Sequence, residues 1–195
     1  GGCVQQGWNE EALEFFDEMQ INGVKPNEIT FVTLLSACSS LFSLQRGAQI
    51  HQEICKDGSD SSMEIGTSLI LMYSNCGQLE EARCVLEMLL SWSLIAYTAM
   101  VVAYAQHGYG KEALEVYHKM LKQEIKANDI TFVSIFSACA HVGLVDDGLE
   151  YFDSMNRVHG IVPCFEHYAG IIDLFGKVGR VSEAKEFVNR IPIQP

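Results

Sequence analysis

The feature that most constrains the fold of this chain is a helical hairpin motif that recurs along its whole length. The most complete copy, residues 94–128, has two stripes of apolar residues at helical spacing, separated by Gly108. The stripes are formed by Tyr97, Met100, Val101 and Tyr104, and by Ala113, Leu114, Tyr117 and Met120. A single hairpin cannot bury both stripes, so neighbouring copies must stack. The pattern predicts an all-α fold, a right-handed superhelical solenoid of helix-turn-helix hairpins.

The copies divide the chain into one continuous array over residues 1–195. The predicted repeats are 1–27 (truncated), 28–62, 63–93, 94–128, 129–164 and 165–195. Glycine recurs where each first helix is expected to end, in a left-handed conformation that other residues resist. These glycines are Gly7, Gly77, Gly108, Gly143 and Gly179. Phe42 stands at that place in 28–62, which makes this repeat divergent.

Composition supports a packed helical chain. Of the 195 residues, 48% are hydrophobic and 19% are charged, and there are only four prolines. No apolar run reaches the roughly 20 residues needed to span a bilayer, so no membrane contact is expected. The seven cysteines form no CxxC motif, which predicts reduced thiols and neither a metal nor a cofactor.

The charge balance is acidic, with 13 Lys and Arg against 25 Asp and Glu and a net charge of −12. Phosphate contacts supply most non-specific affinity for nucleic acids, so this balance argues against such a ligand. Nucleic-acid binding requires that the basic residues cluster along a binding groove while the acidic residues cover the opposite, convex face. Charge alone favours a protein partner.

The repeat length of about 35 residues is compatible with two families of helical repeats, the tetratricopeptide and pentatricopeptide repeats. The tetratricopeptide W-x-x-L-G pattern is missing. The segments that resemble the pentatricopeptide consensus are Tyr97-Thr98, Met100-Val101, Gly108, Glu112-Ala113-Leu114, Met120 and Ile125-Lys126. Repeats 63–93 and 165–195 are shorter than the others, an alternation similar to the plant PLS subclass of this family.

The resemblance implies sequence-specific binding of single-stranded RNA in a mitochondrion or chloroplast, within an RNA-processing factor for C-to-U editing. In this family each repeat recognises about one base through its fifth and last residues. We call these two residues the recognition pair. Thr98 with Asn128 resembles the adenine-recognising pairs, and Thr67 with Ser93 resembles a weaker purine pair. Two adjacent adenines are therefore predicted, with the Thr67 repeat on the 5′ side.

The remaining repeats have incomplete or apolar pairs. Val32 pairs with Ser62 and Val133 with Cys164, and valine cannot hydrogen-bond a base. The resemblance implies that Val32 and Val133 instead wedge between bases. Ala169 with Pro195 carries no base preference, and the fifth-position partner of Asn27 is expected to precede residue 1.

The alternative function is a protein-interaction scaffold with little RNA affinity of its own. The resemblance implies that accessory editing proteins bind the divergent repeats 28–62 and 129–164. Apolar surface at the terminal repeats, especially 1–27, predicts self-association.

Catalysis is not expected. His51-Gln52-Glu53 matches half of a zinc deaminase signature, and Pro163-Cys164-Phe165-Glu166-His167 approximates the other half. However, His167 replaces the second cysteine, and the two segments lie in different repeats. We expect no catalytic and no metal-binding residues.

Overall fold

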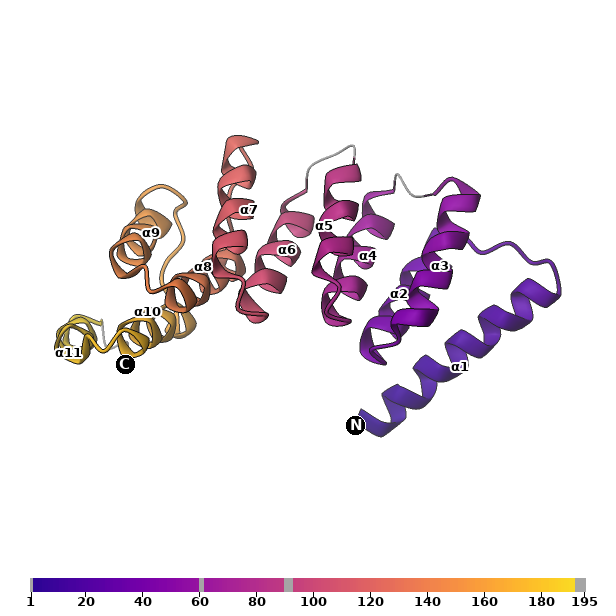
Figure 1. The fold of residues 1–195 in the computed structure, drawn as a ribbon, viewed down its shortest axis with the longest axis horizontal. Helices are drawn as coiled ribbons and strands as arrows, with labels where there is room; N and C mark the ends of the chain where they lie inside the picture. The colour runs from indigo at the N-terminus through magenta and orange to yellow at the C-terminus, as the bar shows by residue number, and fades with distance from the viewer. Residues whose placement is uncertain (1, 60–61, 90–92, 192–195) are drawn as a thin grey trace. The chain divides into compact units, whose positions relative to one another are not determined.

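The computed structural model describes residues 2–59, 62–89 and 93–191, and in these ranges the backbone forms α-helices and no strand (Figure 1). The all-α prediction is confirmed. The helices are α1 (Gly2–Ile21), α2 (Glu28–Ser40), α3 (Leu44–Asp57), α4 (Met63–Asn75), α5 (Leu79–Met88), α6 (Leu94–Gln106), α7 (Gly110–Lys122), α8 (Asp129–Val142), α9 (Val145–Arg157), α10 (Phe165–Lys177) and α11 (Val181–Asn189).

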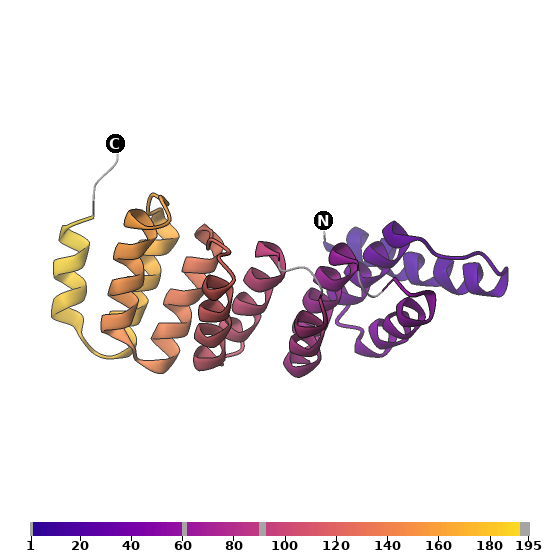
Figure 2. The same cartoon turned by 90° about the horizontal axis from the view of Figure 1, so that it is seen from above.

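The helices group into two compact units, residues 1–100 and residues 101–195, and α6 has residues in both. We call them unit 1 and unit 2. In unit 1, α2 packs against α1, α3 and α4, and α4 also packs against α5. In unit 2, α8 packs against α7, α9 and α10, and α10 also packs against α11. Figure 2 shows consecutive helices of each unit lying side by side.

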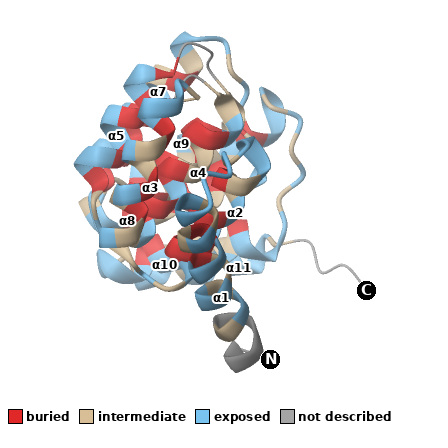
Figure 3. Cartoon of the chain, turned by 90° about the vertical axis from the view of Figure 1, so that its right-hand side faces the viewer, coloured by how far each residue is buried: buried red, intermediate tan, exposed pale blue. Residues whose placement is uncertain are grey.

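The first helix of a predicted repeat and its second helix differ in how many of their sides are buried. α8, a first helix, buries residues on several sides because it contacts three other helices. Its buried apolar residues include Phe132, Ile135, Phe136, Ala138 and Cys139. α9, a second helix, is amphipathic and buries only one stripe, Val145, Gly148 and Met155. Figure 3 colours the chain by burial, with buried residues in red and exposed residues in pale blue.

Glycine ends the first helices as predicted, with one exception. Gly77, Gly108, Gly143 and Gly179 have φ of 76°, 82°, 79° and 77°, the left-handed conformation that permits a tight turn. The prediction for Gly7 is wrong, because Gly7 lies inside α1, which is continuous from Gly2 to Ile21. A Cβ at Gly7 would meet no atom within 4 Å, so this position in the helix does not require glycine.

Phe42 occupies the turn between α2 and α3 with φ of 51° and is 72% exposed. A residue with a Cβ pays roughly 1–2 kcal/mol in this conformation. Its side chain recovers little of that cost, because most of it remains in water. Repeat 28–62 therefore has local backbone strain in the turn where the other repeats have glycine.

The cysteines whose side chains are described are free thiols. Cys38 and Cys139, in the two Ser-Ala-Cys segments, are fully buried in α2 and α8. Burial raises the pKa of the Cys38 thiol to about 11 and that of Cys139 to about 12. These two thiols are therefore structural and unreactive at neutral pH.

Replacing Phe42 with glycine should raise the free energy of unfolding by about 1 kcal/mol, because glycine adopts this φ without strain. The measurement is the urea midpoint of the variant against the parent chain. Gly77→Ala is the reciprocal control, since it introduces a Cβ at a φ of 76° and should lower the midpoint. An unchanged or lower midpoint for Phe42→Gly would contradict the strain at Phe42.

Gly110→Ala should lower the free energy of unfolding by about 1–3 kcal/mol, because the added Cβ would lie 2.5 Å from the backbone oxygen of Ala138 and force α7 away from α8. Gly176→Ala is the matched control inside α10. Its Cβ would meet no atom within 4 Å, so it should stabilise the chain by about 0.5–1 kcal/mol. Equal urea midpoints for the two variants would refute the close α7–α8 packing.

Candidate nucleic-acid interface

The last residue of each predicted repeat immediately precedes the first helix of the next repeat. Asn27, Ser62, Asn128 and Cys164 are the N-cap residues of α2, α4, α8 and α10. Ser93 precedes α6, and its hydroxyl accepts a hydrogen bond from the backbone N–H of Ala96 at 3.1 Å. The residues that the sequence assigns to base recognition therefore also begin the helices.

Asn128 shows how the cap orients a polar group. Its Oδ1 accepts from the backbone N–H of Thr131 at 2.9 Å and from the Thr131 hydroxyl at 2.7 Å. The backbone N–H can only donate, so the atom facing it must be the amide oxygen. Both lone pairs of Oδ1 are then used. Within the described residues nothing accepts from Nδ2, so half-buried Asn128 offers a ligand only donors.

Asn27 repeats this geometry in unit 1. Its Oδ1 accepts from the backbone N–H and the hydroxyl of Thr30, both at 2.8 Å. In both boxes the threonine hydroxyl lies 3.4 Å from the backbone N–H of the asparagine. The two caps differ in their surroundings, because Asn27 is exposed and Asn128 is half-buried. They form a natural pair for comparing variants.

The fifth residues differ in accessibility. Val32, Thr67 and Val133 are half-buried, and Ala169 is exposed. Thr98 is only 7% exposed. Asn128 is therefore the more accessible member of the predicted adenine pair. Thr98 belongs to unit 1 and Asn128 to unit 2.

In each unit one polar bond joins the starts of two neighbouring first helices. The hydroxyl of Ser62, at the start of α4, donates to the carboxylate of Glu28, at the start of α2. In unit 2, His167 Nε2 of α10 lies 3.0 Å from the backbone oxygen of Asp129, the first residue of α8. Val32 and Val133 lie one helical turn beyond Glu28 and Asp129. The structure thus brings Ser62 to the end of α2 that carries Val32, and the cap of Cys164 to the end of α8 that carries Val133. Pro195, the predicted partner of Ala169, lies outside the described residues.

Three exposed isoleucines were not among the residues predicted for the interface. Ile29, Ile95 and Ile130 are the second residues of α2, α6 and α8, and they are 75%, 66% and 55% exposed. Each lies three positions before a fifth residue and so on the same helix face. The sequence contains a signal for them, because isoleucine recurs at the same position of three repeats and this position lies outside the buried apolar stripe.

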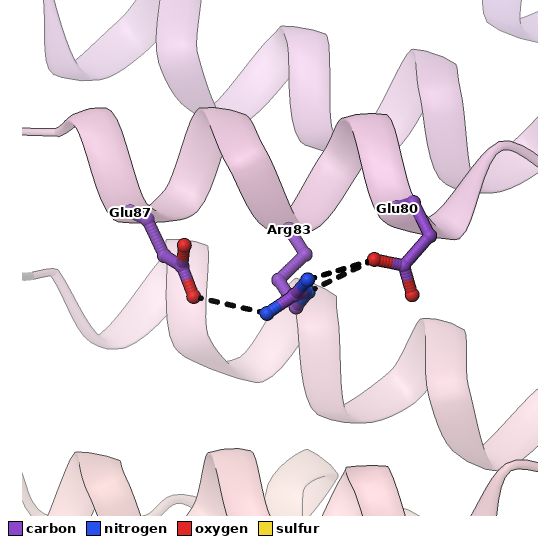
Figure 4. Close-up of polar contacts among 3 residues, drawn as sticks. All are labelled: Glu80, Arg83 and Glu87. Atoms are coloured by element: carbon purple, nitrogen blue, oxygen red, sulfur yellow. Dashed lines mark hydrogen bonds and ion pairs between the residues drawn. The ribbon is translucent and has the colours of Figure 1, made fainter.

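Basic residues do not cluster on the first helices. α2, α4, α6 and α8 contain no Lys or Arg, and α10 contains only Lys177. Several basic side chains are instead paired with acidic residues, as Arg83 on α5 is with Glu80 at 2.8 Å and with Glu87 at 3.3 Å (Figure 4). The first helices therefore lack the cluster of basic residues that nucleic-acid binding requires.

Two lysines lie close in sequence to the capping asparagines. One residue separates Lys25 from Asn27, and one residue separates Lys126 from Asn128. Burial lowers the pKa of the His159 imidazole, and the nearby charge of Lys126 lowers it further. Positive charge near the capped helix ends therefore comes from the connecting loops.

The half-signature around His51 is not part of a metal site in the described structure. His51 Nδ1 lies 2.8 Å from the hydroxyl of Tyr73 and is occupied by that contact. Among the described residues, no group of three or more His, Cys, Asp or Glu side chains is placed to hold a metal ion. In the same residues, no helix combines the length and apolar composition that crossing a bilayer requires.

Stacked helical hairpins with polar caps at equivalent positions define an α-helical repeat protein. Three family models of one such repeat match the chain. A PPR repeat family model matches residues 1–40 and 92–141, a pentatricopeptide repeat domain model matches 118–178, and a PPR repeat model matches 67–94 and 166–192. The chain belongs to the pentatricopeptide repeat family.

Curated relatives from Arabidopsis thaliana match nearly the whole chain. A putative pentatricopeptide repeat-containing protein is 40% identical over 100% of the chain, and a mitochondrial member is 38% identical over 99%. The chain spans only 28% and 21% of these two relatives.

Solved structures share the fold. The maize pentatricopeptide repeat protein PPR10 matches with a TM-score of 0.71 and 23% identity, over 96% of this chain and 28% of that one. The pentatricopeptide repeat domain of Arabidopsis thaliana protein-only RNase P 1, in complex with tRNA, matches with a TM-score of 0.68 and 15% identity, over 94% and 93%. At these identities the likeness shows the solenoid fold of the family.

Asn128→Ala should lower the free energy of unfolding by about 1 kcal/mol, the usual cost of removing an N-cap side chain. Asn27→Ala should cost about the same, because its capping bonds have the same geometry. Asn128→Asp should be nearly neutral, because aspartate caps as well as asparagine. Urea midpoints of the three variants give the test, and a cost for Asn128→Asp equal to that of Asn128→Ala would refute the capping role.

Proposed function

We propose that this chain is a single-stranded RNA-binding module that recognises about one base per repeat. The observation that carries the proposal is the cap of α8, which fixes the oxygen of Asn128 and leaves its Nδ2 donors to a ligand. Two structures with the same fold support it. One holds PPR10 with an 18-nucleotide psaJ RNA element, and the other holds the repeat domain of protein-only RNase P 1 with tRNA.

A donor-only asparagine selects among bases by the edge that faces it. Adenine N1 is an acceptor, whereas guanine N1 carries a hydrogen, so a fixed Nδ2 donor favours adenine at that place. Thr98 stays the proposed fifth-position partner of Asn128 because the family pattern assigns it that place. By the same logic the weaker pair is Thr67 with Ser93, whose hydroxyl already accepts a capping bond. The proposed target contains two adjacent adenines.

The exposed isoleucines supply the apolar part of the interface. Ile29 and Ile130 lie on the same helix faces as Val32 and Val133, and Ile95 lies on the same face as Thr98. A base inserted beside the recognition pair buries apolar surface against such β-branched side chains. At about 25 cal/mol per Å² of buried apolar area, this contact partly replaces missing phosphate contacts.

The proposed interface makes few phosphate contacts, so its affinity should depend weakly on salt. Lys25 and Lys126 are the basic residues nearest to the capping asparagines in sequence. Two neutralised phosphates give a slope of about −1.4 in log K against log salt for single strands. A module with this slope derives most of its affinity from base contacts.

The proposal also covers the location of the protein and the process in which it acts. Relatives named as mitochondrial support an organellar location, mitochondrion or chloroplast. The alternation of long and short repeats supports assignment to the PLS subclass and a role in C-to-U editing, with accessory editing proteins bound at repeats 28–62 and 129–164. Exposed Trp8 and Phe15 on α1, 68% and 62% accessible, support self-association through the first repeat.

The second candidate function is a protein-interaction scaffold. The absence of Lys and Arg from α2, α4, α6 and α8 favours it, because a largely uncharged face suits an apolar partner. RNA binding and partner binding are compatible if they use different repeats. Base-dependent affinity separates the two functions, since a scaffold has none.

Asn128→Asp should move the preferred base opposite repeat 94–128 from adenine to guanine, because a carboxylate oxygen accepts from guanine N1–H. Anisotropy titrations would use a uridine 12-mer with a central AA and the same oligomer with AG. The AG/AA affinity ratio should rise by about tenfold, within the range of roughly 1–3 kcal/mol for one good base contact.

Asn27→Asp is the matched control, because it changes the same chemical group in an equivalent cap and should leave the AG/AA ratio unchanged. An unchanged ratio for Asn128→Asp, with the variant folded, would contradict base recognition by Asn128. Equal affinity of the parent chain for all oligomers would select the scaffold.

A further inference from the structure

Unit 1 contains a small cavity between α3, α4 and α5. Its volume is about 220 Å³, and the residues that line it include His51, Tyr73, Glu81, Val85 and Met88. Pockets that hold a drug-sized ligand measure roughly 300–1,000 Å³, so this cavity suits a single side chain. His51 Nδ1 lies 2.8 Å from the Tyr73 hydroxyl, which fixes the two rings of the wall opposite α5.

One face of α5 gives the cavity an apolar wall that ends in a carboxylate. Glu81, Val85 and Met88 are spaced i, i+4 and i+7 and so lie on the same side of the helix. Met88 is 66% exposed. Glu80 also lines the cavity but is already paired with Arg83 at 2.8 Å. Exposed Glu81 has no hydrogen bond or ion pair with any residue that the structure describes.

In unit 2 the corresponding carboxylate holds an arginine. Repeats 63–93 and 165–195 have the same length and align without gaps, so Glu183 takes the place of Glu81. Nε of Arg180 donates to Glu183 Oε1 at 2.5 Å, and its Nη2 donates to Glu183 Oε2. The two parallel bonds match the fork of a guanidinium to the two oxygens of a carboxylate, which a lysine cannot do.

An aromatic ring completes this arrangement in both units. The guanidinium carbon of Arg180 lies 5.8 Å from the centroid of the Phe175 ring, within the range of a cation–π contact. Tyr73 takes the place of Phe175 in unit 1. Burial raises the pKa of the Tyr73 hydroxyl, and the nearby charge of Glu81 raises it further. The ring and the carboxylate are therefore close together in unit 1 as well.

Unit 1 lacks the guanidinium itself. Gln78 stands at the place of Arg180, and its neutral amide cannot form an ion pair. A second carboxylate, Asp146, also bonds Arg180 at 3.3 Å and is 90% exposed. Its counterpart is Gln45, whose amide oxygen is an acceptor. Unit 1 thus keeps a carboxylate, an aromatic ring and an acceptor at the places that hold an arginine in unit 2.

We propose that this cavity binds an arginine side chain of a partner protein. The guanidinium pairs with Glu81 beside the Tyr73 ring, and the methylene groups lie against Val85 and Met88. Charge complementarity supports a basic partner, because the chain has a net charge of −12 and attracts cationic segments. The site is separate from the proposed RNA contacts, which lie at the starts of first helices, so its test requires no RNA.

The test follows the nuclear magnetic resonance signal of the Met88 ε-methyl group while a blocked peptide, acetyl-Gly-Arg-Gly-amide, is added to the chain. The signal should shift and saturate. The same peptide with citrulline in place of arginine keeps the shape but loses the charge, and it should bind about fivefold more weakly or less, as should the lysine peptide. Equal affinity for the arginine and citrulline peptides would overturn the proposal.

Glu81→Gln should weaken the arginine peptide about fivefold, because the ion pair is lost. Gln78→Arg should weaken it as well, because it supplies a guanidinium to Glu81 from the chain itself, as Arg180 does in unit 2. Glu87→Gln is the matched control. It removes the same charge from the same helix, but Glu87 pairs with Arg83 and does not line the cavity (Figure 4).

These substitutions are at exposed or half-buried positions, so the variants should remain folded, which circular dichroism checks. An affinity of Glu81→Gln equal to that of the parent chain would overturn the proposal. A Met88 signal that shifts on dilution of the parent chain alone would also overturn it, because a second copy of the chain would then occupy the cavity.

Discussion

The structure depends on the polar caps that begin the first helices α2, α4, α6 and α8. A helix leaves its first backbone N–H groups without intrahelical partners, and a side chain at the N-cap satisfies one of them. Asn27, Ser62, Ser93 and Asn128 do this with an oxygen acceptor at the junction of two repeats. The cap fixes where one repeat ends and the next helix begins. It also fixes the direction of the remaining polar atoms.

This double role links the fold to the proposed recognition of RNA. The last residue of a repeat must accept a backbone hydrogen bond and, if it recognises a base, must present a second group outward. Asparagine can do both because its amide has an oxygen and a nitrogen on one carbon. A serine hydroxyl can accept and donate through only one atom. The geometry therefore explains why Asn128 is a stronger candidate for base recognition than Ser93.

Much of the fold could be predicted from the sequence because hydrophobic period and turn glycines act locally. Gly77 and Gly143 mark real turns, whereas Gly7 lies inside a helix, because glycine permits a turn but does not require one. The strain at Phe42 could be expected from its alignment with glycines. The exposure of Ile29 and the burial of Thr98 could not be predicted, because both depend on which helix faces the neighbouring helices cover. The contact between His167 Nε2 and the backbone oxygen of Asp129 could not be predicted either, because it joins residues distant in sequence.

Charge separates this chain from proteins that bind RNA mainly through phosphates. Its first helices carry almost no basic residues, and pairs such as Arg83 with Glu80 occupy cations on the second helices. Any RNA affinity must then come from base edges and apolar contacts, which makes it specific but weak. The scaffold alternative draws on the same uncharged surface.

The most direct test of the account is the nuclear magnetic resonance signal of the Asn128 side-chain Nδ2 hydrogens during titration with an adenine-containing single strand. We predict that this signal shifts on addition of the AA oligomer and shifts much less with an all-uridine strand. The backbone amide of Thr131 should stay protected in both cases, because the cap persists. A signal unaffected by either strand, with RNA bound elsewhere or not at all, would contradict the claim that the cap residue recognises a base.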